Sequence, residues 1–235
     1  MTHKPTTATT TPLASPDAPA GPRIGTDEAG KGDYFGHLVV AAVHVEPGQE
    51  ESLRALGVRD SKRMADSVAR RLAGEIKARA ASDVVRISPR RYNELYAKLR
   101  NLNHLLAWAH ARAIENLLAR APAPLVISDQ FGDEQWLRQA LMRRGRHVLL
   151  VQTPRAEQDV AVAAASVLAR AAFLEGLETL SARVGLTLPK GATHVTDAAR
   201  QIWLRGGEEL LGEVAKLHFR ITQKLRQGEP GAAGE

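Results

Sequence analysis

Residues 24–36 (IGTDEAGKGDYFG) hold the residue types best suited to chemistry in this chain. Two adjacent carboxylates, Asp27 and Glu28, are followed by a cation between glycines, Gly30-Lys31-Gly32. Glycines let a backbone approach a sugar-phosphate chain closely, so that peptide groups can reach a ribose hydroxyl while Lys31 contacts a phosphate. Two acids beside such a turn predict a metal-assisted reaction on a phosphate ester.

The same stretch also fits the spacing G-x-x-x-x-G-K at residues 25–31, which is typical of the phosphate-binding loop of nucleotide hydrolases. Gly32 stands where that loop needs a Ser or Thr hydroxyl for Mg²⁺, and Asp27 and Glu28 would repel bound phosphates. We therefore reject the nucleotide-hydrolase interpretation. A tight turn between two strands is the plain alternative, and a substrate-binding turn requires the same geometry.

Two further acids stand where secondary-structure elements are expected to meet. Asp129 ends the apolar run 125–128, and Glu157 opens the Ala-rich span 157–183. Taken singly, each is better explained as a helix cap or as a partner of the helix dipole. Four carboxylates in one place would repel one another unless cations or protons neutralise them. Two divalent ions would do so, and oxygen-only ligands favour Mg²⁺ or Mn²⁺ over Zn²⁺.

The elements that must position these acids follow from hydrophobic spacing. Apolar runs of strand length lie at residues 38–45, 84–87, 125–127 and 147–151. Helical spacing covers residues 61–79, 103–120, 133–144 and, most strongly, 157–183. Strands followed by strand-helix alternation predict an α/β fold with a mixed central sheet flanked by helices. The small residues 161–166 predict close packing of the last helix on the sheet, which would bring Glu157 near the first strand.

Composition sets the outer limits. The 235 residues are 44% hydrophobic and 25% charged, which predicts one folded domain. We expect that domain at residues 23–226, between disordered tails at 1–22 and 227–235. The net charge of +6 favours a polyanionic partner. The absence of cysteine and of an export or membrane-spanning segment predicts a cytoplasmic protein.

Several motifs, in order, resemble those of the type 2 ribonucleases H. They are GTDEAGKGDYFG at 25–36, DSK at 60–62, ISDQF at 127–131 and AEQDVAVAAASVLAR at 156–170. The ribonuclease HIII branch is the closer match, because Glu157 stands in a position where the ribonuclease HII branch normally carries aspartate. Residues 92–114, 188–192 and 215–219 resemble that branch as well. The resemblance extends from about residue 24 to about residue 222.

The resemblance implies an RNase H-like fold with a helical C-terminal part, and cleavage of the RNA strand of RNA/DNA hybrids to 5′-phosphate and 3′-hydroxyl ends. It implies catalytic, metal-binding acids at Asp27, Glu28, Asp129 and Glu157, which would hold two Mg²⁺ or Mn²⁺ ions. It implies further substrate contacts by Gly30, Lys31, Gly32, Asp60, Ser61, Lys62, Asn101 and Asn103. Asp60 or Ser61, and Asn101 or Asn103, can equally be explained as helix caps.

Two other polar residue types need an interpretation. Asp159 lies two residues beyond Glu157, which on a helix turns its side chain about 200° away, so we take Glu157 as the fourth acid. His194 and His218 are better explained as core or surface residues than as ligands.

The chain departs from the HIII branch in one respect, because only the Thr- and Pro-rich tail precedes the catalytic motifs, where that branch usually carries a substrate-binding domain. Substrate affinity would then depend on the catalytic domain, on a partner, or on cations such as Arg143, Arg144 and Arg146. We expect a monomer without an organic cofactor. The alternatives are incision at single ribonucleotides in DNA, as in the HII branch, for which we expect weak activity, and non-catalytic hybrid binding.

Overall fold

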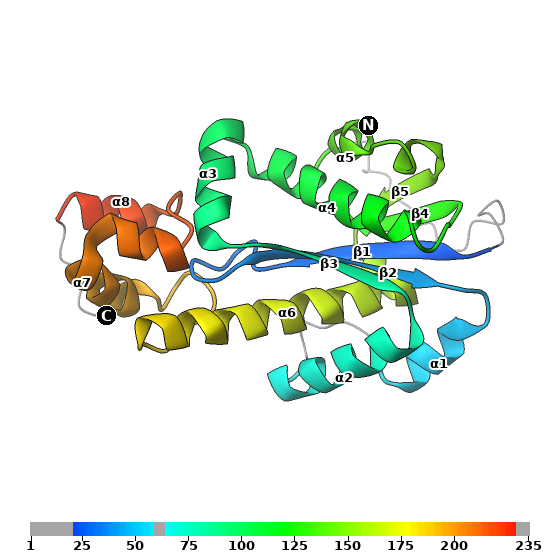
Figure 1. Cartoon of the computed structure of the whole chain (residues 1–235), viewed down its shortest axis with the longest axis horizontal. Helices are drawn as coiled ribbons and strands as arrows, with labels where there is room; N and C mark the ends of the chain where they lie inside the picture. The colour runs from blue at the N-terminus through cyan, green and yellow to red at the C-terminus, as the bar shows by residue number, and fades with distance from the viewer. Residues whose placement is uncertain (1–20, 59–63, 229–235) are drawn as a thin grey trace, which may run out of the picture.

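Within residues 21–58 and 64–228, which the computed structural model describes, five strands form one mixed sheet (Figure 1). In spatial order they are β3 (Ser82–Ile87), β2 (Leu38–Val45), β1 (Arg23–Ala29), β4 (Leu125–Asp129) and β5 (Leu149–Thr153). β1 is antiparallel to β2 and parallel to β4. The sheet therefore changes direction at the strand that carries Asp27 and Glu28.

The parallel pairing of β1 with β4 decides which side chains share an edge of the sheet. Thr26 aligns with Ser128, so the next residues, Asp27 and Asp129, both lie at the carboxyl ends of neighbouring strands. Open α/β sheets bind ligands at this edge. The register alone thus brings together acids that are far apart in the sequence.

Helices cover both faces of the sheet (Figure 1). α3 (Pro89–Leu99), α4 (Leu102–Leu118) and α5 (Glu134–Ala140) lie on one side, and α1 (Gln49–Ala55), α2 (Asp66–Arg79) and α6 (Val160–Val184) on the other. α7 (Thr196–Val214) and α8 (Arg220–Arg226) lie together at one end. Two 3-10 turns, η2 (Gly145–His147) and η3 (Ala156–Gln158), flank β5. The predicted fold class, including its helical C-terminal part, is confirmed.

β2 belongs to two hydrophobic cores at once. Val39 and Val43 pack in the core that contains α6, whereas Leu38 and Val40 pack in the core that contains α4. This alternation follows from the two-residue period of a strand. Because helices cover both of its faces, the whole strand is buried, as its unbroken apolar sequence predicts.

α6 approaches the sheet closely because the contact residues are small. A Cβ atom on Gly25 of β1 would lie 2.2 Å from the backbone of Ala161 and Val162. The Ala-rich start of α6 therefore packs directly on β1, as the run at 161–166 predicts. The helix is long and apolar enough to cross a membrane by composition, but 83% of its most apolar window is buried inside the protein. Its apolar character is accounted for by the core.

Several predicted element boundaries are wrong by a few residues. α6 begins at Val160, because Asp159 caps it by accepting the Ala161 N–H at 2.8 Å. Glu157 consequently lies in η3 and not on the helix, so the helical geometry used above to separate it from Asp159 does not apply.

The other differences are of the same kind. α4 covers Leu102–Leu118 and not residues 103–120, and α5 ends at Ala140 and not at residue 144. His147 belongs to η2 and not to β5. The predicted helix at 61–79 begins at Asp66 within the described residues.

Gly25→Ala tests the close contact between β1 and α6. The added methyl group would meet backbone atoms at 2.2 Å, and backbone cannot rotate away, so we expect a loss of at least about 1–3 kcal/mol in the free energy of unfolding. Gly74→Ala is the matched control, because Gly74 lies at an exposed position of helix α2 with open space beside it, and a gain of up to about 1 kcal/mol is expected. Urea unfolding followed by circular dichroism measures both. Equal stability of Gly25→Ala and the wild type would contradict the contact.

Candidate active site

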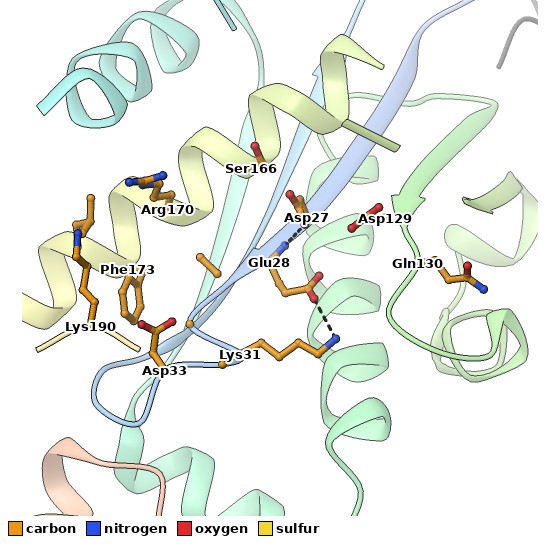
Figure 2. A pocket seen from close by; sticks show the side chains of 14 residues that line it. Asp27, Glu28, Lys31, Asp33, Asp129, Gln130, Ser166, Arg170, Phe173 and Lys190 are labelled. Atoms are coloured by element: carbon orange, nitrogen blue, oxygen red, sulfur yellow. Dashed lines mark hydrogen bonds and ion pairs between the residues drawn. The ribbon is translucent and has the colours of Figure 1, made fainter. Parts of the chain in front are cut away.

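A cleft of about 480 Å³ opens at the carboxyl ends of β1 and β4 (Figure 2). Six of the residues singled out from the sequence line it: Asp27, Glu28, Gly30, Lys31, Gly32 and Asp129. Five polar residues that were not predicted as site residues line it as well: Asp33, Gln130, Ser166, Arg170 and Lys190. Acids and cations therefore share one cleft, in the place that the sheet register dictates.

Asp27 and Glu28 lie on opposite faces of the sheet because they are consecutive residues of a strand. Glu28 contacts His110 of α4, whereas Asp27 lies on the side of Ser166 of α6 (Figure 2). The Glu28 backbone N–H donates to Oδ1 of Asp27 at 2.8 Å, which fixes the Asp27 side chain against the strand end. The two acids thus enter the cleft from different faces, while Asp129 points toward Asp27 from the next strand (Figure 2).

His110 holds Glu28 in place from the centre of α4. Its ring is fully buried and stacks on Phe131, with ring centroids 4.7 Å apart. Nε2 lies 3.2 Å from Oε2 of Glu28, and Nδ1 lies 3.0 Å from the hydroxyl of Thr26. Since a carboxylate only accepts hydrogen bonds, Nε2 donates to Glu28, while Nδ1 is hydrogen-bonded to the hydroxyl of Thr26.

The same contacts set the charge of Glu28. Burial raises the pKa of this carboxyl, but the hydrogen bond and charge of His110, with a further contribution from Lys31, outweigh burial and hold the pKa below its ordinary value. Glu28 is therefore kept ionised. Lys31 Nζ lies 3.5 Å from Oε1 of Glu28, so in this structure the predicted phosphate-binding cation pairs with a site acid.

His110 is not among the site residues predicted from the sequence. A signal was present, because a histidine in the middle of a strongly apolar helix face requires a buried partner. What the sequence alone does not provide is the pairing of α4 with the end of β1, which identifies that partner as Glu28.

Asp129 and Glu157 are linked through the backbone of η3. Oδ1 of Asp129 accepts the N–H of Ala156 at 3.2 Å, which fixes the turn that contains Glu157 beside the end of β4. Glu157 itself is partly exposed and is not among the residues that line the cleft. Three of the four predicted acids therefore line the site, and the fourth lies next to it.

The cleft-lining acids fit a hard divalent cation by ligand type. Asp27, Glu28 and Asp129 offer only carboxylate oxygens, the ligands that Mg²⁺ and Mn²⁺ prefer. In the described part of the chain, however, no three acidic or histidine side chains are close enough to hold one ion as they stand. Ligands would have to move toward the ion, and Glu157 is the nearby acid that the sequence predicts for this role.

Asp159 is engaged elsewhere. One of its oxygens caps α6 and the other accepts Nε of Arg23 at 2.7 Å. Arg23 in turn binds Glu50 at 2.6 Å. This acid therefore ties the start of α6 to β1, which agrees with its exclusion from the predicted site.

Asn101 and Asn103 are not among the residues that line the cleft. Asp60, Ser61 and Lys62 lie outside the described residues. Asn101 caps α4 by accepting the Asn103 N–H at 2.9 Å, and Asn103 lies in the first turn of that helix. Capping thus accounts for Asn101, while the interpretation of both residues as substrate contacts stays a prediction.

The cations and histidines considered in the sequence differ in their exposure and contacts. Arg143, Arg144 and Arg146 are exposed around η2. His194 is exposed, and His218 packs among Tyr92, Tyr96 and Phe219. In the cleft, Arg170 and Lys190 both bind Asp66, at 2.8 and 2.6 Å.

Comparisons with known proteins agree with this geometry. The family model for ribonuclease HII matches residues 24–222. Ribonuclease HIII of Protochlamydia amoebophila (strain UWE25) is 48% identical over 205 residues, which is 87% of this chain and 68% of the relative. Ribonuclease HIII of Chlamydia pneumoniae is 44% identical over 217 residues, 88% of this chain and 71% of the relative. The crystal structure of Bst-RNase HIII in complex with Mn²⁺ superposes with a TM-score of 0.83 at 37% identity, covering 96% of this chain and 76% of that one.

His110→Phe tests whether the histidine controls the charge of Glu28. The ring volume and the stacking on Phe131 are kept, but the hydrogen bond to Glu28 is lost, so we expect the Glu28 pKa to rise. Lys31→Gln is the control, and we expect a smaller rise because Lys31 is farther away and more exposed. A pH titration of the Glu28 carboxyl carbon by NMR measures both. An unchanged Glu28 pKa in His110→Phe would show that His110 does not set this charge.

Proposed function

Because this chain belongs to the type 2 ribonuclease H family, in its ribonuclease HIII branch, we propose that it cleaves the RNA strand of RNA/DNA hybrids to 5′-phosphate and 3′-hydroxyl ends. The family membership makes it a metal-dependent endoribonuclease. The observation that carries the finer proposal is the convergence of Asp27, Glu28 and Asp129 beside the glycine-flanked Lys31. We also propose that it acts as a monomer without an organic cofactor.

The reaction is hydrolysis of a phosphodiester. The oxygen of a water molecule forms a new bond to phosphorus, the bond from phosphorus to the 3′ oxygen breaks, and that oxygen leaves as a hydroxyl after taking up a proton. Asp27, Glu28, Asp129 and Glu157 would hold the metal. Divalent ions bound there, two of them in our proposal, supply the charge that activates the water and stabilises the departing oxygen. The crystal structure of Bst-RNase HIII in complex with Mn²⁺ supports Mn²⁺ as the bound ion. The carboxylate ligands suit Mg²⁺ equally.

The chain's own residues orient the acids and the substrate. His110 keeps Glu28 ionised and fixed, and the Glu28 N–H fixes Asp27. Loss of a hydrogen bond that holds a metal ligand typically lowers metal affinity or activity by about 10–100-fold. Gly30 and Gly32 let the backbone approach the RNA, where a 2′-hydroxyl distinguishes it from DNA. When phosphate enters, Lys31 can exchange its 3.5 Å contact with Glu28 for a substrate oxygen.

Asp129→Asn separates a nuclease from a hybrid-binding protein. The substitution keeps the shape of the side chain but removes a charge needed for the metal, so we expect cleavage of a labelled hybrid to fall by more than about 100-fold. Binding of the hybrid should persist or tighten, because one charge that repels phosphate is lost.

The assay compares Mg²⁺, Mn²⁺ and chelator, with an all-RNA/DNA hybrid and a duplex that carries one ribonucleotide. We expect weak cleavage of the second substrate. Hybrid binding by the wild type without metal-dependent cleavage would indicate the non-catalytic alternative, and equal rates on the two substrates would indicate HII-like specificity.

Glu157→Gln and Asp159→Asn form a matched pair that tests the choice of the fourth acid. Both remove one charge from neighbouring residues. We expect Glu157→Gln to lower cleavage and Mn²⁺ affinity with little change in stability. Asp159→Asn should instead weaken the contact with Arg23 and lower the free energy of unfolding by about 1.5–3 kcal/mol while leaving metal affinity intact. The reverse pattern, with metal affinity lost only in Asp159→Asn, would reject Glu157.

A further inference from the structure

The loop that carries Gly30, Lys31 and Gly32 is held in place by the C-terminal part of the chain. This loop, residues 30–37, joins β1 to β2 and is called the substrate loop below. Phe35 forms an antiparallel bridge with Ala215, and the N–H of Gly36 donates to the carbonyl of Val214 at 3.0 Å. On the other side of the loop, the N–H of Tyr34 donates to the carbonyl of Gly191 at 2.9 Å. The loop backbone thus has partners on two separate C-terminal segments.

Lys216 makes the most unusual of these contacts. Its side chain is fully buried, and its Nζ donates to the carbonyls of Asp33 and Gly36, both at 2.8 Å. Its backbone N–H donates to the carbonyl of Tyr34 at 2.9 Å. One residue therefore holds three carbonyls of the substrate loop.

A buried lysine normally requires a carboxylate partner. Among the described residues no carboxylate forms an ion pair with Lys216, and Oδ1 of the nearby Asp33 accepts the N–H of Gly191 at 2.6 Å. Burial lowers the pKa of Lys216 to about 7. A Met or Leu would fill the same space without this desolvation cost. What only the amine adds is a pair of hydrogen bonds to the loop carbonyls.

The tip of the substrate loop depends on such anchors. A Cβ atom on Gly32 would meet nothing within 4 Å, so there is open space beside the tip at this position. Gly36, by contrast, lies against Phe173, where an added Cβ would approach the ring to 2.8 Å. The tip is therefore held from its two sides, by the close packing of Gly30 on the His37 carbonyl and Phe173, and at residues 33–36, where Lys216 binds.

We propose that Lys216 is a positioning residue for ribose recognition, which fixes the backbone of the substrate loop so that its glycine peptides meet the 2′-hydroxyl of the RNA strand. This inference rests on the proposed function, because it assumes that the substrate loop faces the RNA. A positioning role for Lys216 can be distinguished from a purely structural role by its effect on substrate binding. Loss of the amine should reduce discrimination between RNA/DNA and DNA/DNA duplexes, beyond any loss of stability.

The test measures binding of an RNA/DNA hybrid and of the same DNA/DNA sequence to uncleaving Asp129→Asn protein, with and without Lys216→Met. We expect the ratio of the two affinities to fall about tenfold in Lys216→Met, which corresponds to the loss of one well-formed hydrogen bond. Thr222→Val is the matched control, since Thr222 is also buried and its hydroxyl contacts the substrate loop through the side-chain hydroxyl of Tyr34, at 3.0 Å. It should lower stability and leave the ratio within about twofold.

Lys216→Gln provides a second variant should Lys216→Met fail to fold. Its amide is a neutral donor one bond shorter, which cannot reach both carbonyls, so we expect a smaller fall of the ratio in the same direction. An unchanged ratio in a folded Lys216 variant, or an equal fall in Thr222→Val, would overturn the inference. If the wild type binds hybrids in preference to DNA/DNA duplexes but does not cleave them, the proposed nuclease activity is refuted and the inference about Lys216 is retained.

Discussion

The parallel pairing of β1 with β4 is the constraint on which the site depends. It places Asp27 and Asp129 at the same edge of the sheet, and the antiparallel return of β2 places the substrate loop beside them. Hydrogen-bond donors beside the cleft offset part of the negative charge that this pairing concentrates. His110 and Lys31 contact Glu28, and the backbone N–H of Ala156 contacts Asp129. The fold thus gathers like charges and supplies each with a donor.

This arrangement explains why the site is built from so many separate elements. A strand presents Asp27 and Glu28 to opposite faces, so one helix layer must serve each acid. α4 provides His110 to one, and the small residues of α6 leave room beside the other. The close contact at Gly25 is therefore part of the same design, since a larger residue there would move α6 away from the acids.

Sequence reasoning was most successful where a local pattern determines the structure. The apolar run at 38–45 coincides with the bounds of β2, and the motif around Asp27 supplies half of the residues that line the cleft. It was less successful where the answer depends on a distant partner. The start of α6 is decided by a cap at Asp159 that also binds Arg23, and the role of His110 is decided by the packing of α4 on β1. Lys216 was not singled out, because nothing in its neighbours along the chain shows that it is buried. Glu157 and the substrate contacts remain predictions.

The anchoring of the substrate loop has a consequence for how this protein is made. The carbonyls of Asp33 and Gly36 bind an amine 183 and 180 positions later in the chain. Contacts of such long sequence separation form slowly, and a ribosome delivers the N-terminal partner first. During synthesis, the acidic residues therefore leave the ribosome well before the substrate loop acquires its fixed conformation. If Lys216 positions the substrate loop as proposed, ribose recognition starts only after residues 214–216 have left the exit tunnel.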